Sequence, residues 1–254
     1  MSFIPPFRGH LPRAITLLAG AAAAGCSGVQ STLDPAGPAA SSIAQTWWVM
    51  AIGATAILML VMALLFYTLT ARQGSSRRTP GVRLIFMGGL LLPSFTLIAL
   101  LTYGTVVSRR VAMMEQPAEL VIRVVARRFH WDFHYPAVNG APGALITDVL
   151  VLPRERNVQF HVTSADVIHS FWIPRLGGKI DAIPGRVNVL NLRADKGGPI
   201  SGQCAEFCGL LHAHMRFDVL ALAPADFDRW LADGGRQPPP RARAEVPRPR
   251  EVRQ

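Results

Sequence analysis

The sequence predicts a membrane-anchored all-β protein, in which a hairpin of two transmembrane helices precedes a β-sandwich or β-barrel domain. Two long apolar runs lie in the first half of the chain, and short strand-like segments fill most of the second half. Half of the 254 residues are hydrophobic and 17% are charged, whereas a typical soluble domain has about 25% charged residues. Three cysteines are too few for a disulfide framework.

The N-terminus has the pattern of a secretory signal peptide over residues 1–25. A short region with two arginines precedes the small, apolar residues 14–24, which are too few to span a bilayer as a helix. The segment ends just before Cys26 in a way that resembles a bacterial lipoprotein cleavage site, so Cys26 is a candidate for lipidation. The alternative is a plain signal peptide or an uncleaved anchor. Residues 26–45, rich in Ser, Ala, Gly and Pro, are predicted to form a linker.

A transmembrane hairpin is predicted over residues 46–111, with spans at about 47–71 and 84–107. Each apolar run is long enough to cross about 30 Å of hydrocarbon as a helix. Tryptophans at the start of the first run suit the membrane interface. Pro93 falls inside the second run and predicts a kink there.

The positions of the basic residues predict the orientation of the hairpin. The loop between the two runs carries four arginines, and the linker before the first run carries no Lys or Arg. By the positive-inside rule this loop is cytoplasmic, so the rest of the chain faces outward. A cleaved signal peptide predicts the same topology. We therefore expect a two-pass protein of the bacterial inner membrane with its second half in the periplasm.

Residues 112–233 are predicted to form the β domain. Short alternating or β-branched segments are separated by Pro and Gly, which is typical of a sandwich or barrel. A short helix is expected from Pro224, with Phe227, Trp230 and Leu231 on one face. Residues 234–254 are predicted to be a disordered basic tail. The strand-like segments are Glu119–Arg127, Leu145–Leu152, Asn157–Thr163, Arg186–Leu192 and Met215–Ala221.

The formal net charge of +10 does not indicate a nucleic-acid-binding protein. Residues 117–232 carry twelve basic and eleven acidic residues, so the predicted domain is nearly neutral. The excess of arginine lies at the membrane flanks and in the tail. A nucleic-acid site would instead place basic residues on one face of a folded unit.

One short segment concentrates the chemistry of the chain. Cys204, Cys208, His212 and Met215 follow the spacing Cys-x3-Cys-x3-His-x2-Met. Thiolate, imidazole and thioether together favour copper or another soft, redox-active metal, whereas zinc more often takes Cys and His alone. A Cys204–Cys208 disulfide is the main alternative in an oxidising compartment. His169, about 35 residues upstream, is a candidate second imidazole, although a single histidine is more often structural.

Three ordered motifs resemble subunit II of cytochrome c oxidase. In chain order, the motifs are Asp166-x2-His169-Ser170, Lys179-x-Asp181-Ala-Ile-Pro-Gly-Arg, and Gly202-Gln-Cys204-x-Glu-x-Cys-Gly, which continues to His212 and Met215. The resemblance covers about residues 45–232, including the two preceding spans. It implies a cupredoxin-like Greek-key β-barrel that faces the periplasm.

The resemblance also implies a binuclear copper A centre. Cys204 and Cys208 would bridge two copper ions, and His169 and His212 would be the terminal imidazoles. Met215 would be a weak ligand to one copper. The backbone carbonyl of Glu206 would reach the other copper, while its side chain would join a magnesium site shared with subunit I. A solvated loop carboxylate is the alternative for that side chain.

An aromatic stretch resembles the family segment whose exposed tryptophan accepts the electron. Aligned on Trp131, the accepting position here is Phe129, which is a departure from the family pattern. Phe129 and Trp131 are therefore the candidate electron-accepting residues, and core packing is the alternative for both. Many members of this family present acidic residues to a basic cytochrome c. The nearly neutral domain and the basic tail here favour an electron-donor protein that is less basic, or acidic.

The function implied is that of the electron-accepting subunit of a proton-pumping oxidase. Electrons from cytochrome c would pass through copper A to the haem of subunit I, where oxygen is reduced to water. Expected partners are subunits I and III, cytochrome c or another periplasmic donor, and the lipid bilayer. A copper-free, structural subunit II of a quinol oxidase is the main alternative. A nitrous-oxide-reducing or copper-handling protein with the same domain is a second alternative.

Overall fold

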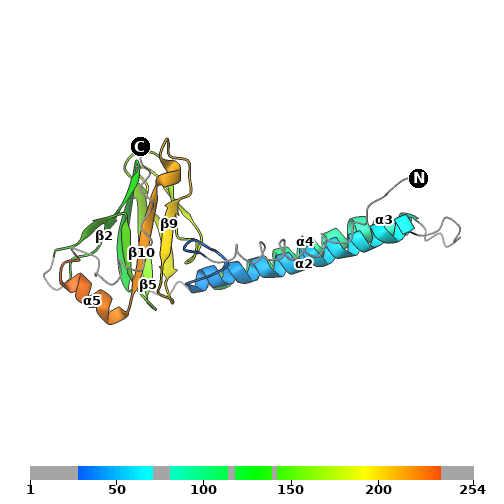
Figure 1. Cartoon of the computed structure of the whole chain (residues 1–254), viewed down its shortest axis with the longest axis horizontal. Helices are drawn as coiled ribbons and strands as arrows, with labels where there is room; N and C mark the ends of the chain where they lie inside the picture. The colour runs from blue at the N-terminus through cyan, green and yellow to red at the C-terminus, as the bar shows by residue number, and fades with distance from the viewer. Residues whose placement is uncertain (1–27, 71–80, 114–117, 139–141, 236–254) are drawn as a thin grey trace, which may run out of the picture.

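The computed structural model of the chain describes residues 28–70, 81–113, 118–138 and 142–235. The predicted signal peptide, the lipidation candidate Cys26 and the tail from residue 236 onward lie outside these ranges. Two apolar helices form a long hairpin that projects from an all-β domain (Figure 1). The predicted fold class is therefore confirmed.

Both apolar helices are long enough to cross a bilayer. Helix α2 covers Pro38–Thr70, and the second helix runs from Gly81 to Met113 through α3 (Gly81–Ile85), η1 (Phe86–Leu91) and α4 (Leu92–Met113). In each helix, the most apolar stretch is not buried against any other part of the described chain. At 1.5 Å per residue, α2 alone exceeds the thickness of a hydrocarbon core.

The second helix departs from α geometry just before Pro93. Residues Phe86–Leu91 form a π-helical segment, and the backbone N–H of Leu92 donates to the carbonyl of Met87 five residues earlier. A proline lacks an N–H, and its ring crowds the carbonyl four residues before it. The wider π turn accommodates that crowding, so the irregularity predicted at Pro93 occurs within the preceding turn.

The β domain consists of two five-stranded sheets (Figure 1). Within each sheet one neighbouring pair is parallel, β1 with β5 and β4 with β10, and the other pairs are antiparallel. The first sheet has the order β3 (Leu145–Thr147), β2 (His130–His134), β1 (Leu120–Arg127), β5 (Asn157–Ser164) and β8 (Asn188–Arg193). The second has the order β4 (Val149–Pro153), β10 (Arg216–Leu222), β9 (Ile200–Cys204), β6 (His169–Trp172) and β7 (Ile180–Ala182).

The single strand predicted over 145–152 is two strands that belong to different sheets. Asp148 separates β3 from β4 and has a φ of 58°, in the left-handed region. Its backbone N–H donates to the Trp131 carbonyl, and its carboxylate accepts the Trp131 N–H at 2.8 Å. The aspartate tolerates this conformation better than the β-branched residues around it do, so the chain changes sheets here.

Alternation along the strands explains the core. In β5, Val158, Phe160 and Val162 are buried and the residues between them are partly exposed. Helix α5 (Pro224–Ala232) closes one end of the domain. The face predicted from the sequence is buried: Phe227, Trp230 and Leu231.

The predicted linker over 26–45 is wrong for much of its length. Helix α2 begins at Pro38, and the backbone around Ala36 joins the β domain. The Ala36 N–H donates to the Arg175 carbonyl at 2.7 Å, and the Ala36 carbonyl accepts from Asp195 at 2.8 Å. Ala36, Ala40 and Ala44 are buried. Small residues allow this close approach, but they give no hydropathy signal that distinguishes packing from a linker.

Arg175 fastens this N-terminal segment to the β domain. Its side chain is only 8% exposed. The guanidinium donates to the Asp34 carbonyl and the Asp34 carboxylate, both at 2.8 Å, and to the Pro199 carbonyl at 2.9 Å. A buried guanidinium is costly unless its donors are satisfied. The segment from about residue 28 to 44 is therefore part of the domain.

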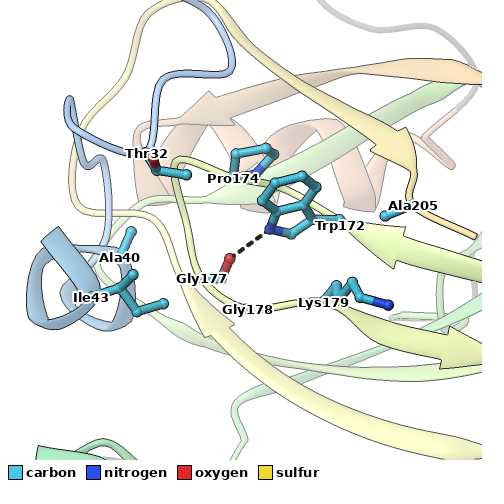
Figure 2. A pocket seen from close by; sticks show the side chains of 9 residues that line it. All are labelled: Thr32, Ala40, Ile43, Trp172, Pro174, Gly177, Gly178, Lys179 and Ala205. Carbon is cyan, nitrogen blue, oxygen red and sulfur yellow. Dashed lines mark hydrogen bonds between the residues drawn. The ribbon is translucent and has the colours of Figure 1, made fainter. Parts of the chain in front are cut away.

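A mostly apolar pocket of about 440 Å³ lies where this segment meets the turn after β6 (Figure 2). Ala40 and Ile43 of α2 form one wall, and Trp172 and Pro174 form another. The indole N–H of Trp172 donates to the Gly177 carbonyl at 3.1 Å, which holds the turn closed. The first turns of α2 therefore complete the surface of the domain.

We expect Asp34→Ala to destabilise the β domain by about 1–2 kcal/mol, because Arg175 would lose a charged hydrogen-bond partner while remaining buried. Thermal unfolding of the full-length chain in detergent, followed by near-ultraviolet circular dichroism, measures this change. Glu119→Ala is the matched control, since it removes a carboxylate that is 57% exposed and 3.7 Å from Arg156. Equal unfolding temperatures for the two variants would contradict the fastening role of Asp34.

Candidate metal centre

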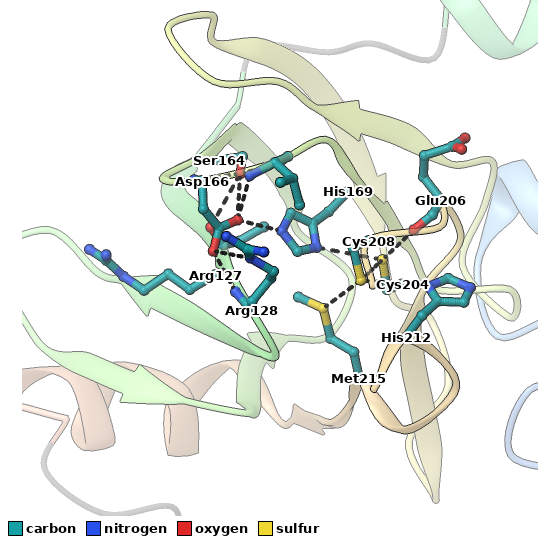
Figure 3. Close-up of polar contacts among 12 residues, drawn as sticks. Arg127, Arg128, Ser164, Asp166, His169, Cys204, Glu206, Cys208, His212 and Met215 are labelled. Atoms are coloured by element: carbon teal, nitrogen blue, oxygen red, sulfur yellow. Dashed lines mark hydrogen bonds and ion pairs between the residues drawn. The ribbon is translucent and has the colours of Figure 1, made fainter. Parts of the chain in front are cut away.

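The candidate centre is built from two chain segments that the second sheet brings together. His169 is the first residue of β6, and Cys204 is the last residue of β9. These strands are antiparallel neighbours, with Phe171 opposite Cys204. The loop after Cys204 returns through the 3-10 turn η2 (His212–His214) to Met215, directly before β10. Figure 3 shows these side chains directed at one another.

The sulfur and imidazole atoms converge on the two thiols. The Sγ atoms of Cys204 and Cys208 are 3.9 Å apart. The Nδ1 atom of His169 lies 3.8 Å from the Cys204 sulfur, and that of His212 lies 3.6 Å from the Cys208 sulfur. Met215 Sδ is 3.8 Å from Cys208 Sγ. Both cysteines are free, and their separation is far from the 2.05 Å of a disulfide.

Ligand atoms of three of these residues form a compact group. The available atoms of His169, Cys204 and Cys208 all lie within 4.8 Å of one another. His212 adjoins this group through Cys208. The spacing suits metal ions placed between the thiols and imidazoles, and the combination of thiolates, imidazoles and a thioether suits copper.

Two glycines allow the loop to take this path. Gly209, directly after Cys208, has a φ of 131°, which L side chains rarely adopt, and a Cβ there would lie 3.3 Å from the ring of Phe129. At Gly202 the ring of Phe217 occupies the space that a Cβ would need. Both glycines named in the sequence motif therefore have a packing reason.

Asp166 orients the buried histidine. Its carboxylate lies 2.8 Å from His169 Nε2 and accepts backbone N–H groups from Arg128 at 2.7 Å and Val167 at 2.6 Å. A proton on Nε2 leaves the lone pair of Nδ1 directed at the sulfurs, as a metal ligand requires. Sequence reasoning gave Asp166 no role, although its position three residues before His169 in the motif was visible.

The electrostatics around the centre favour the ionised forms of Asp166 and Cys204. Burial raises the pKa of the Asp166 carboxyl, but its hydrogen bonds to His169 and to the backbone outweigh this and lower that pKa to about 2. Burial also opposes ionisation of Cys204, yet hydrogen bonds from His169 and the nearby backbone hold the pKa of this thiol below its usual value.

The second thiol behaves in the opposite way. Burial and the neighbouring Cys204 raise the pKa of Cys208, because two negative charges so close together repel each other. A cation between the sulfurs removes that repulsion and lets both thiols bind as thiolates.

The side of the centre around His169 is buried and aromatic. His169 is fully buried, and Met215 and both cysteines are nearly so. The ring of Trp131 lies 6.1 Å from that of His169, and Phe171 stacks on Phe217 at 5.2 Å. Packing of this kind restricts movement of the ligand side chains and excludes water.

Glu206 presents its backbone and its side chain in different directions. Its carbonyl oxygen lies 3.2 Å from the Cys204 sulfur. Its exposed carboxylate points away from the sulfurs (Figure 3). An open depression of about 550 Å³ lies beside it and is lined on another side by Asp181.

The two candidate electron-accepting residues differ in burial. Trp131 is fully buried, so a partner protein cannot touch it in this conformation. Phe129 is half-buried, and its ring lies against the backbone of Gly209, next to Cys208. Of the two, only Phe129 reaches both the surface and the cysteine loop.

Comparison with known proteins gives one consistent family. Residues 139–222 match the family described as the periplasmic domain of cytochrome c oxidase subunit II. A probable cytochrome c oxidase subunit 2 of Rickettsia bellii is 38% identical over 132 residues, 45% of this chain and 49% of that protein. Cytochrome c oxidase subunit 2 of Alkalihalophilus pseudofirmus is 32% identical over 224 residues, 82% of this chain and 63% of that protein.

Among solved structures, the periplasmic domain of subunit II of cytochrome oxidase from Bradyrhizobium japonicum is 30% identical. The match covers 47% of this chain and 96% of the solved domain, with a TM-score of 0.41. A subunit II domain in a mixed disulfide with a thioredoxin-like protein is 34% identical, with a TM-score of 0.39. This chain spans roughly half of the length of the curated relatives it matches.

We expect Asp166→Asn to weaken copper binding about tenfold or more, because the amide holds the His169 imidazole less firmly than the carboxylate does. Competition with a copper chelator, using the full-length chain in detergent, measures the affinity. Asp228→Asn is the control: it removes a carboxylate on α5 that pairs with Arg156 at 2.7 Å. Unchanged copper affinity in the Asp166 variant would contradict the orienting role.

Proposed function

Because this chain belongs to the cytochrome c oxidase subunit II family, we propose that its β domain is the electron-accepting module of a terminal oxidase. Electrons from cytochrome c or another periplasmic carrier enter here and pass to the haem of subunit I. There oxygen is reduced to water, coupled to proton pumping. The observation that carries the proposal is the approach of two imidazoles and a thioether to one pair of buried thiols.

The residues present fit a binuclear copper A centre, which supplies one-electron redox chemistry when bound. Cys204 and Cys208 would hold the ions through their sulfurs, and His169 and His212 would bind through their Nδ1 atoms. Met215, next to Cys208, and the Glu206 carbonyl, next to Cys204, would be weaker ligands. Their support is the set of short distances to the two thiols.

The protein contributes rigidity and exclusion of water. Asp166 fixes the His169 ring, and the aromatic packing beneath it restricts the ligands to small movements. A site whose ligands move little on gaining an electron has a low reorganisation cost. Burial of the sulfurs and hydrogen bonds to the imidazoles tune the reduction potential.

We also propose that the two helices anchor this domain at the periplasmic face of the inner membrane, beside subunits I and III. The arginine-rich loop after α2 supports a cytoplasmic position for the far end of the hairpin. Lipidation of Cys26 stays a prediction from the sequence.

The Glu206 carboxylate is proposed to contribute to a magnesium site completed by subunit I. Hard oxygen ligands suit Mg²⁺, and an exposed carboxylate is free to serve a partner subunit. Asp181 lines the same depression.

A copper-free quinol-oxidase subunit would have no use for the two thiols and two imidazoles, so we do not favour that alternative.

The first experiment counts copper in the full-length chain, because residues 28–44 are needed to complete the domain. We expect two copper ions per chain, with one unpaired electron shared between them in the EPR spectrum and intense thiolate charge-transfer bands. Cys204→Ser should abolish this spectrum. Cys26→Ser, the matched control outside the centre, should keep it. One copper per chain, or none after prior reduction of the thiols, would refute the proposal.

The two roles of Glu206 are separable by mutation. We expect Glu206→Gln to leave the copper spectrum unchanged, because only its backbone carbonyl faces Cys204. In the assembled oxidase, the same variant should lose the EPR signal of Mn²⁺ substituted for magnesium. Loss of copper from the variant would contradict the backbone assignment, and retention of Mn²⁺ would contradict the side-chain assignment.

A further inference from the structure

We propose that the domain receives its electrons from an acidic carrier protein, which docks on the β1–β2 turn beside the cysteine loop. The inference rests on the proposed function and names the partner of the same site by its chemistry. The surface, here called the basic docking face, consists of Arg127, Arg128, Phe129, Gly209 and Leu210. The carrier it fits has an apolar patch over its redox group and a surrounding ring of carboxylates.

The centre of the basic docking face is apolar and adjoins the metal ligands. The side chain of Leu210 is 93% exposed. The ring of Phe129 packs on Gly209, which is covalently bonded to Cys208. A carrier seated on this surface is therefore separated from a proposed ligand by one aromatic ring and one peptide unit.

The rim of the basic docking face is positive because its two arginine side chains are more exposed than the carboxylates with which they pair. The side chains of Arg127 and Arg128 are 50% and 52% exposed. Asp132 and Asp166, which lie 3.0 Å and 3.8 Å from these two guanidinium groups, are only 12% and 24% exposed.

The same two carboxylates are also occupied from within the protein. Asp132 accepts a hydrogen bond from Thr147, and Asp166 holds His169 and two backbone N–H groups. They therefore present little negative charge outward. An approaching protein meets the two guanidinium groups first.

The exposed acid of the cysteine loop lies elsewhere. Figure 3 shows Arg127 and Arg128 on one side of the sulfurs and the Glu206 carboxylate on the other. Asp181 lines the depression beside Glu206 and has Lys179 3.5 Å away. The centre thus has a basic side and an acidic side, which suits a donor on the first and a magnesium-sharing subunit on the second.

Charge complementarity then selects the carrier. A basic carrier would bring its lysines against Arg127 and Arg128, whereas carboxylates would be attracted to them. Such steering changes association rates more than it changes the affinity of the docked complex. The transfer would take one electron from the reduced redox group of the carrier, which is thereby oxidised, to the copper that the cysteine and histidine ligands would hold. No bond forms or breaks.

The test compares two donors built on the same haem protein, one with a basic surface and one with an acidic surface. Reduced cytochrome c with its native lysines, and the same protein with its lysines succinylated, are each mixed with the copper-loaded full-length chain in detergent. Stopped-flow absorbance follows reduction of the copper centre over a series of ionic strengths. We expect the succinylated donor to react about tenfold faster at low ionic strength and to be slowed by salt.

Variants locate the effect on the chain. The double variant Arg127→Gln, Arg128→Gln should lose most of the advantage of the succinylated donor and most of its salt dependence, with unchanged copper content and EPR spectrum. Arg229→Gln is the matched control, because this arginine lies on α5 and its side chain is 77% exposed. It should behave as the unaltered chain does.

The outcomes separate this inference from the proposed function. Faster reduction by native cytochrome c, slowed by salt, would overturn the acidic-donor inference while leaving the electron-accepting function intact. An unchanged rate in the double variant would overturn the docking face. If neither donor reduces a correctly loaded copper centre, the proposed function itself fails.

Discussion

The antiparallel pairing of β6 with β9 is the constraint on which the candidate centre depends. It brings the start of one strand, His169, to the end of the other, Cys204, although 35 residues separate them. The two sulfurs and the second imidazole then follow within one loop that Gly209 allows to turn. Because both strands belong to a packed sheet, the scaffold restricts movement of His169 and Cys204, as the proposed electron-transfer site requires.

The same scaffold couples the centre to its surroundings. Asp166 joins His169 to the backbone of Arg128, so the imidazole is linked to the turn that carries Phe129. Arg175, in the turn after β6, binds Asp34, just before α2. The β domain is thereby attached directly to the start of helix α2. An attachment of this kind keeps the domain at a defined position relative to the helices.

Charge gives the centre two different sides. Carboxylates that serve the interior are shielded, and the cations that cover them face outward near Phe129. The free carboxylate of Glu206 faces the other way. The domain is nearly neutral as a whole, but its exposed charges are unevenly distributed around the centre.

The sequence by itself determined the class of the protein and the chemistry of its centre. Long apolar runs, strand alternation and the set Cys204, Cys208, His212 and Met215 are local patterns, and each is readable without knowing the fold. The tertiary structure decided the rest: the role of Asp166, the packing of residues 28–44, the break at Asp148 and the burial of Trp131. Most of these features depend on contacts between residues far apart in the chain. Periodicity and composition carry no information about such contacts, because they describe each segment alone.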